Sequence, residues 1–124
     1  MPLIRNDEAP HFDLHGVSFR GLAAPSRGSR ETSVWRVSLP PQARGAAHSV
    51  DREEIFVALA GRAVAMLDGQ EHELGAGDTL IVPAGLTFSL ANPGAEAFEA
   101  LAVAPAGVRA RLPGGEPFAP PWTT

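Results

Sequence analysis

The feature that most constrains the fold is the regular interruption of the chain by turn-forming residues. Thirteen Gly and twelve Pro divide the 124 residues into short segments that alternate in polarity and are rich in Val, Leu, Ile and Phe. Alternation with a period of two is typical of half-buried strands, and no segment carries a convincing helical period. The pattern therefore predicts an all-β sandwich or barrel.

The turns between the predicted strands carry their own signals. Asp68-Gly69 separates two strand candidates and is the strongest hairpin signal in the chain. The tail, residues 106–124, is too rich in Pro and Gly for a core strand, so we expect it to be extended. The predicted strands cover residues 17–22, 33–39, 47–50, 54–59, 63–67, 70–74, 79–82, 87–91 and 97–103.

Charge and composition exclude several classes of function. The formal net charge is -4 at pH 7, and the sequence lacks the basic stripe that a phosphate backbone requires. The absence of Cys excludes disulfides, thiolate ligands and cysteine nucleophiles, and the absence of Lys and Tyr excludes Schiff-base and phenolic acid catalysis. We therefore expect no nucleic-acid partner, and acid-base chemistry must come from His, carboxylates or Arg.

The length of the chain sets its organisation. With 124 residues and 44% hydrophobic content, there is room for a single domain with one core, residues 1–124. No window approaches the roughly 20 apolar residues of a membrane span, and the first residues show no cationic leader. We expect a cytoplasmic protein with no membrane partner.

The strand predicted at residues 54–59 is apolar on both of its alternating faces apart from Glu54. Such a strand is covered on both sides, once by the barrel interior and once by another surface. The second cover is either the N-terminal arm or a partner subunit, and pairing with a second copy is a common solution for exposed sheet edges. We expect a homodimer.

A polar motif lies in the middle of the chain. His48 is followed by Val50, then after three further residues by Glu54, and six residues separate Glu54 from Gly61. This spacing resembles the first motif of the cupin family, H-x-H, three or four residues, E, six residues, G. Val50 stands at the position of the second histidine.

A second motif follows at the spacing that the same family shows. Gly77, Pro83, Gly85 and Asn92 match a glycine, five residues, P-x-G, two residues, a histidine, three residues and an asparagine. Phe88 stands where the family has its histidine. The two motifs span residues 48–92, and the chain resembles a small single-domain, RmlC-like cupin whose metal-binding motif is incomplete.

The resemblance implies a double-stranded β-helix, or jelly-roll barrel, with an extended N-terminal arm and a Pro-rich C-terminal tail of about residues 106–124. Family members place three histidines and a glutamate around a divalent ion. Here only His48 and Glu54 remain as ligands, which is fewer than the three that dedicated sites usually have. We expect no metal cofactor; a divalent metal would be held by His48 and Glu54, with rescue by His11, His15 or His72 left open.

Without a metal, the side chains near the motif suggest a pocket. Glu54 would lose hydration in an apolar barrel, so it is predicted to be neutral or to pair with His48 or with one of Arg36, Arg44 and Arg52. His48 and Glu54 are candidate catalytic residues. The predicted ligand pocket comprises Trp35, Val50, Phe56, Met66, Phe88 and Leu90, with Arg36 and Arg52 as anchors for an acidic substrate.

Three functions follow as hypotheses. The first is binding of a small, partly apolar organic ligand in the barrel, with the usual metal site degraded. The second is a metal-free isomerase, epimerase or cyclase that uses His48 and Glu54 as an acid-base pair. The third is a metal-dependent cupin oxygenase with a non-standard ligand set. The cupin fold serves many chemistries, so the motifs alone do not choose among them.

Overall fold

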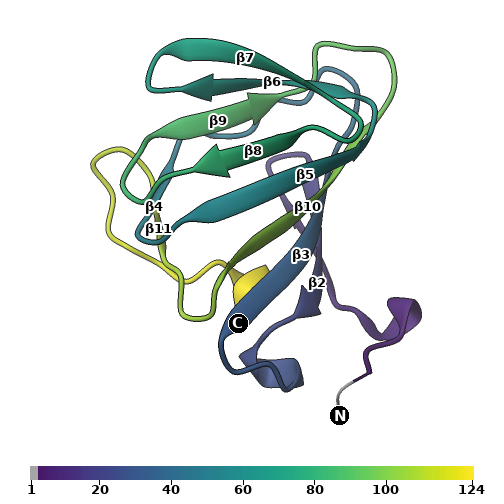
Figure 1. Ribbon diagram of the computed structural model, residues 1–124, viewed down its shortest axis with the longest axis vertical. Helices are drawn as coiled ribbons and strands as arrows, with labels where there is room; N and C mark the ends of the chain where they lie inside the picture. The colour runs from purple at the N-terminus through teal and green to yellow at the C-terminus, as the bar shows by residue number, and fades with distance from the viewer. Residues whose placement is uncertain (1–2) are drawn as a thin grey trace.

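The architecture is an antiparallel jelly-roll barrel, seen in a computed structural model that describes residues 3–124 (Figure 1). Three short 3-10 helices accompany the strands, at Asn6–Glu8 (η1), Pro25–Arg27 (η2) and Pro121–Thr123 (η3). The strands in chain order are β1 (His11–Leu14), β2 (Val17–Ala23), β3 (Thr32–Leu39), β4 (Ser49–Val50), β5 (Glu54–Ala60), β6 (Arg62–Leu67), β7 (Gln70–Gly75), β8 (Thr79–Val82), β9 (Phe88–Ala91), β10 (Phe98–Pro105) and β11 (Ala110–Arg111).

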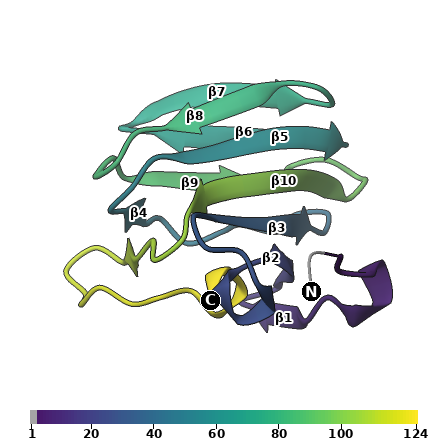
Figure 2. The ribbon, with the colours of Figure 1, turned by 60° about the horizontal axis from the view of Figure 1, so that its bottom comes forward.

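Two sheets face each other across the barrel. The larger has the order β1-β2-β3-β10-β5-β8 and the smaller the order β7-β6-β9, while β4 pairs with β11. Figure 2 shows the larger sheet as a stack from β8 to β1, with β7, β6 and β9 in the layer behind it. Because side chains alternate along each strand, every second residue of both sheets points into the space between them.

The core fills this space from both sides. Trp35, Val37 and Leu39 point inward from β3, each at most 4% exposed, and Phe88 and Leu90 face them from β9. Burying a large apolar side chain stabilises the folded state by about 1.5–3 kcal/mol. The inward alternation of these strands is the pattern from which the all-β barrel was predicted, and the prediction is confirmed.

The structure adds two strands to the nine predicted ones. The N-terminal segment is not only an extended arm, because β1 forms a hairpin with β2 that pairs Phe12 with Phe19. Three of the four β1 residues are exposed, so the segment lacks the alternation that would have revealed it. The other addition, β11, has two residues in the tail and pairs with β4. The nine predicted strands agree with the observed ones to within two residues at each end.

Two glycines of the motifs have backbone conformations that are unfavourable for residues with a side chain. Gly61 has φ of +76°, and a Cβ at this position would overlap the carbonyl oxygen of Ala97. Gly85 has φ of +82°, also in the left-handed region that favours glycine. These glycines therefore shape the corners of the barrel and do not depend on metal binding.

The motif asparagine is also structural. Asn92 is 1% exposed, and its side-chain amide donates to the carbonyl oxygens of Leu39 (2.9 Å) and Glu96 (2.7 Å). Its Oδ1 accepts a hydrogen bond from the backbone N–H of Gly94 at 3.0 Å. The side chain thus satisfies two backbone groups of the β9–β10 connection and one at the end of β3, which explains its place in the motif without reference to a ligand.

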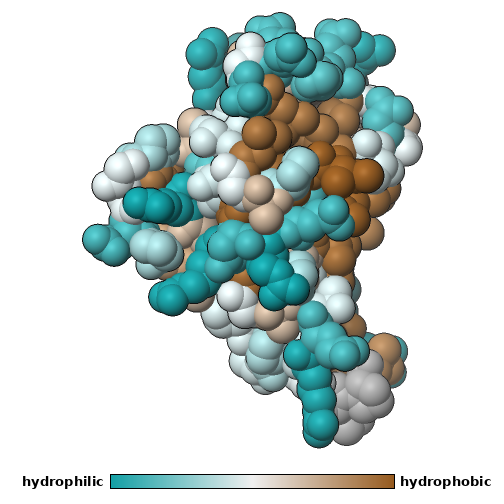
Figure 3. Space-filling view, turned by 60° about the vertical axis from the view of Figure 1, so that its left-hand side comes forward, coloured by the Kyte–Doolittle hydropathy of each residue, from teal (hydrophilic) through white to brown (hydrophobic). Residues whose placement is uncertain are grey.

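Hydrophobic side chains also reach the outer surface. Across four strands of the larger sheet the pairing aligns Val34, Val103, Ile55 and Ile81 on the outer face, and Ile81 is 57% exposed. Figure 3 shows a broad hydrophobic area bordered by hydrophilic residues on the side that it displays. The homodimer stays a prediction. No helix in residues 3–124 is long and apolar enough to cross a membrane.

Candidate functional site

The barrel contains a cavity of about 120 Å³ that is partly open to solvent and whose walls are almost entirely apolar. The inward side chains of β2, β3, β5 and β9 form one part of the wall, and the C-terminal tail forms the other. The polar side chains among the lining residues are few: His15, His48, Glu54 and Thr123. A polar group in these surroundings has little competing water, so each one is a candidate for ligand contact.

Glu54 is the most unusual of these groups. It is the first residue of β5, it is 4% exposed, and its Oε1 is buried with no hydrogen-bond partner. Loss of hydration on burial raises the pKa of Glu54 to about 8. At neutral pH the carboxyl group is therefore protonated and can donate a hydrogen bond into the cavity.

His48 is the second titratable group in the cavity, and its pKa is shifted in the opposite direction to that of Glu54. Burial lowers the pKa of His48, and a hydrogen bond to the carbonyl oxygen of Ala46, 2.9 Å from Nδ1, opposes part of that shift. A carbonyl can only accept, so Nδ1 carries the proton and Nε2 of the neutral ring is a free acceptor. The ring also packs against Phe88, with ring centroids 4.4 Å apart.

The predicted pairing of these two groups does not occur as a direct contact. His48 and Glu54 line the same cavity, but no hydrogen bond joins them in the described structure, and Glu54 Oε1 has no partner. The arginines predicted as partners of Glu54 do not contact its carboxyl group either. Arg36, Arg44 and Arg52 are all exposed to solvent. The carboxyl is thus kept neutral by desolvation, with no counter-charge.

Five of the predicted pocket residues line the cavity: Trp35, Val50, Phe56, Phe88 and Leu90. Met66, Arg36 and Arg52 do not, and their assignment to the pocket is corrected. Met66 alternates with Ala65, whose buried side chain faces the core, so Met66 lies on the outer face of β6. Arg36 likewise alternates with Trp35 and points outward, and Arg52 lies in an exposed bend between β4 and β5.

Part of the wall comes from the tail, which the pocket prediction left out. Trp122 of η3 stacks on Phe19, with centroids 3.6 Å apart and planes within 1° of parallel. Phe118 is held by two backbone hydrogen bonds to Ala110, of 2.8 and 2.9 Å. The aromatic residues of the Pro-rich tail are the signal in the sequence, but only the folded structure shows that they close their own barrel. His15 joins the lining from the β1–β2 turn.

The residues present do not fit a resident metal ion of the kind that the motif implies. Of the four motif positions, His48 and Glu54 carry donor atoms, whereas Val50 and Phe88 present hydrocarbon to the cavity. Within residues 3–124 no group of three or more His, Cys, Asp or Glu side chains could hold a metal ion. His11 Nε2 lies 3.6 Å from Asp13 Oδ1 at the surface, and His72 is exposed on β7. His15 lines the cavity with His48 and Glu54, but the three do not form a group that could hold a metal ion. The metal-dependent oxygenase hypothesis therefore lacks a donor set among these residues.

The fold is shared with solved structures of several named activities. The polyketide cyclase RemF from Streptomyces resistomycificus superposes with a TM-score of 0.78 at 17% identity, covering 87% of this chain and 81% of that chain. A predicted oxalate decarboxylase from Thermotoga maritima gives 0.73 at 24% identity, with coverages of 84% and 98%. A putative sugar phosphate isomerase from Acidithiobacillus ferrooxidans gives 0.71 at 17% identity, with coverages of 90% and 81%. Identities at this level show the common fold alone.

Comparison of the sequence with protein-family models identifies the family. No curated protein matches the chain. The family model described as the cupin domain matches residues 35–104, which is more than half of the chain and runs from within β3 to within β10. The motif spacing, the jelly-roll barrel and this match agree: the chain belongs to the cupin family.

Proposed function

We propose that the protein binds a small, mainly apolar organic molecule in the barrel cavity and holds it by a hydrogen bond from the protonated carboxyl of Glu54. The observation that carries the proposal is the buried Glu54 Oε1, which has no partner in the structure. An unsatisfied buried polar group costs about 1–3 kcal/mol, so a ligand that supplies a partner recovers this free energy on binding. The ligand therefore needs one polar atom opposite Glu54.

The walls indicate what the rest of the ligand is. Phe56 and Phe88 meet edge to face, with centroids 5.7 Å apart, and Trp35 lines the same space. Aromatic walls favour flat rings, which pack against them in offset or edge-to-face geometry. A cavity of roughly 150 Å³ accepts benzene, so a volume of about 120 Å³ limits the ligand to one ring. A short substituent would extend toward the open side of the cavity, where the lining residues Leu112 and Phe118 are exposed.

Both tryptophans line the cavity, which provides a direct test. Trp35 and Trp122 are the only two in the sequence, so a ligand in the barrel alters the intrinsic fluorescence. We expect acetophenone, a neutral ring with one carbonyl acceptor, to change the fluorescence saturably at pH 6.5. Glu54→Leu keeps the volume but removes the donor, and the affinity should fall about tenfold, as for a lost buried hydrogen bond. Glu54→Gln keeps a donor and should retain binding.

The matched control is Glu53→Gln, which alters the exposed neighbouring carboxylate and should leave binding unchanged. Raising the pH above 8 ionises Glu54 and replaces the donor by an acceptor. The affinity for acetophenone should then fall, and that for benzylammonium should rise. Equal affinities of the wild-type protein and Glu54→Leu for acetophenone would contradict the role of Glu54.

A second candidate function, proton transfer, is favoured by the protonation states in the cavity. A protonated carboxyl and a neutral imidazole with a free Nε2 are an acid and a base that do not neutralise each other. Glu54 can protonate a ligand carbonyl oxygen while His48 Nε2 removes a proton from the adjacent carbon. The C–H bond breaks, the O–H bond forms, and an enol results. This is the chemistry of a metal-free isomerase or cyclase.

Deuterium exchange separates binding from catalysis. The methyl protons of acetophenone in D₂O should exchange faster with the wild-type protein than with buffer, and the exchange is followed by NMR. Loss of the acid in Glu54→Gln, or of the base in His48→Phe, should reduce the protein-dependent rate about a hundredfold, the usual contribution of such a group. Binding without exchange above the buffer rate would reject the catalytic role and leave the binding function intact.

A further inference from the structure

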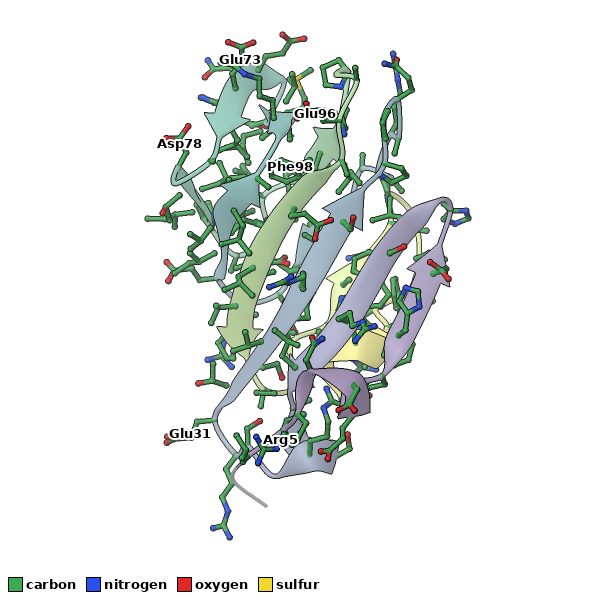
Figure 4. All side chains as sticks on the ribbon, turned by 90° about the vertical axis from the view of Figure 1, so that its right-hand side faces the viewer. Arg5, Glu31, Glu73, Asp78, Glu96 and Phe98 are labelled. Atoms are coloured by element: carbon green, nitrogen blue, oxygen red, sulfur yellow. The ribbon has the colours of Figure 1, made fainter. Side chains whose placement is uncertain are left out.

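The outer face of the larger sheet carries two polar rows that the barrel cavity does not use. The pairing of β1 with β2 and of β2 with β3 places His11, Arg20 and Arg36 directly opposite one another in one row. These residues alternate with inward-facing ones, such as Trp35, so the row points away from the cavity. Figure 4 views β3, β2 and β1 side by side from this direction.

The second row runs parallel to the first, two residues along each strand. It contains Asp13, Ser18, Ser38 and Glu99, which the same pairings and that of β3 with β10 bring opposite one another. Ser18 Oγ donates to Asp13 at 2.8 Å, and Ser38 Oγ donates to Glu99. Both carboxylates are thus engaged by the hydroxyl groups beside them.

The two arginines therefore lie opposite each other, and no carboxylate forms an ion pair with either of them in the described residues. In residues 3–124 the one ion pair within 4.0 Å joins His11 to Asp13, and neither guanidinium takes part in it. Arg20 Nη1 donates to the backbone carbonyl of Asn6 at 2.8 Å, which fixes its position but leaves its charge uncompensated. Like charges directly opposite on neighbouring strands are destabilising, so the apposition of Arg20 and Arg36 has a cost when nothing is bound.

A hollow of about 320 Å³ lies over these rows, lined by both arginines and by His11, Ser18, Ser38 and Glu99. Each guanidinium presents a planar fork of N–H donors that matches the oxygens of an oxyanion. The two oxygens of a planar carboxylate accept the N–H donors of a single guanidinium group. A tetrahedral phosphate has enough oxygens to accept hydrogen bonds from two guanidinium groups at once. The apposed pair suits the second geometry.

We propose that this outer groove is a phosphate-binding site in which Arg20 and Arg36 bind the oxygens of inorganic phosphate or of a phosphate monoester. The bound dianion removes the repulsion between the guanidinium groups. The carboxylate of Glu99 lines the groove and disfavours larger polyanions, because extra negative charge would meet it. The site lies on the opposite side of the sheet from the cavity and does not depend on what the cavity binds.

The probe is inorganic phosphate, titrated at constant ionic strength against sodium chloride and followed by calorimetry and thermal unfolding. The wild-type protein should bind saturably with one site. Arg36→Gln and Arg20→Gln should each weaken binding at least tenfold. Arg52→Gln, which removes an exposed guanidinium far along the chain from the groove, should bind as the wild type does.

Thermal stability in the absence of phosphate is a second test of the apposed arginines, because the substitution that weakens phosphate binding should not lower it. In phosphate-free buffer, Arg36→Gln removes the like-charge contact and should unfold at the same or a higher temperature than the wild type. Arg36→Lys keeps the charge without the fork and should bind phosphate with an affinity between those of the wild type and Arg36→Gln. A response to phosphate that never saturates, that chloride reproduces, or that Arg52→Gln loses equally would overturn the site. Titration with acetate distinguishes a phosphate site from a general carboxylate site, since equal affinity for acetate would also overturn it.

Discussion

Between pH 6.5 and 8 the free energy of unfolding of the wild-type protein is expected to fall with rising pH, and Glu54→Gln is expected to abolish most of this fall. Glu54 ionises near 4.5 in the unfolded chain and near 8 in the folded protein. Between these values the folded state holds a proton that the unfolded state has released. Stability therefore decreases by about 1.4 kcal/mol per pH unit from this group.

The choice of pH window follows from His48. Its pKa is lowered from 6.5 in the folded protein, so below pH 6.5 the unfolded state binds a proton that the folded state does not. In that range His48 raises stability as the pH increases and opposes the effect of Glu54. At pH 6.5 half of the unfolded chains still carry the His48 proton, and the opposing effect fades within about one pH unit above this value. From there to pH 8, Glu54 is the remaining group with a resolved shift.

Urea unfolding at several pH values measures the slope. Glu54→Gln is neutral at all pH values and should give a nearly flat profile, so that it exceeds the wild type in stability above about pH 8. Glu53→Gln, with the buried carboxyl intact, should keep the wild-type slope. A wild-type profile as flat as that of Glu54→Gln would mean that Glu54 is ionised in the folded protein and has a partner that the structure does not show.

The sequence was sufficient to predict the strands because their signal is local. In β3 the inward residues Trp35 and Val37 alternate with Arg36, and this pattern survives in the fold. The same alternation, applied strictly, already places Arg36 outside the barrel. Arg36 was predicted to anchor an acidic substrate in the pocket, and its outward position on β3 rules out that role. Glu54 needs no arginine, because desolvation alone raises its pKa.

The parts of the site that could not be predicted depend on contacts between distant segments. Trp122 lies over Phe19, more than a hundred residues earlier, and buried Ser33 donates to the carbonyl of Thr123 at 2.8 Å. A Pro-rich tail has no period that identifies the surface it covers. Met66 was assigned wrongly for a different reason. Every residue from Ala63 to Leu67 is apolar, so the alternation pattern does not tell which face of this strand is inside the barrel.

The double variant Val50→His, Phe88→His is expected to bind one divalent metal ion, such as Zn²⁺ or Mn²⁺, in the barrel. Val50 and His48 line the same cavity as Glu54, and Phe88 is fixed opposite His48 by two backbone hydrogen bonds of 3.0 and 2.8 Å. Three imidazoles and a carboxylate then converge, which is enough for a dedicated site. Without metal the variant should lose about 3–5 kcal/mol of stability through the loss of the Phe88 ring.

Metal should restore part of this loss, because a ligand that binds only the folded state stabilises it by about 2.7 kcal/mol at a hundredfold excess over its Kd. Elemental analysis and thermal unfolding with and without Zn²⁺ measure the two effects. The single variants should bind far more weakly, and Glu54→Gln in the double-histidine background should weaken binding again. A folded double variant that binds no metal would show that the two motif positions do not converge on His48 and Glu54.

The number of protons released when the double variant binds metal reports whether Glu54 is protonated before binding. A carboxyl with a pKa of about 8 is protonated at pH 7 and must lose its proton to become a ligand. Calorimetric titrations in buffers of different ionisation enthalpy should therefore report about one more proton released at pH 7 than at pH 9. The Glu54→Gln form of the double variant lacks this proton. Equal proton release at the two pH values would mean that Glu54 is an anion in the double variant before the metal binds.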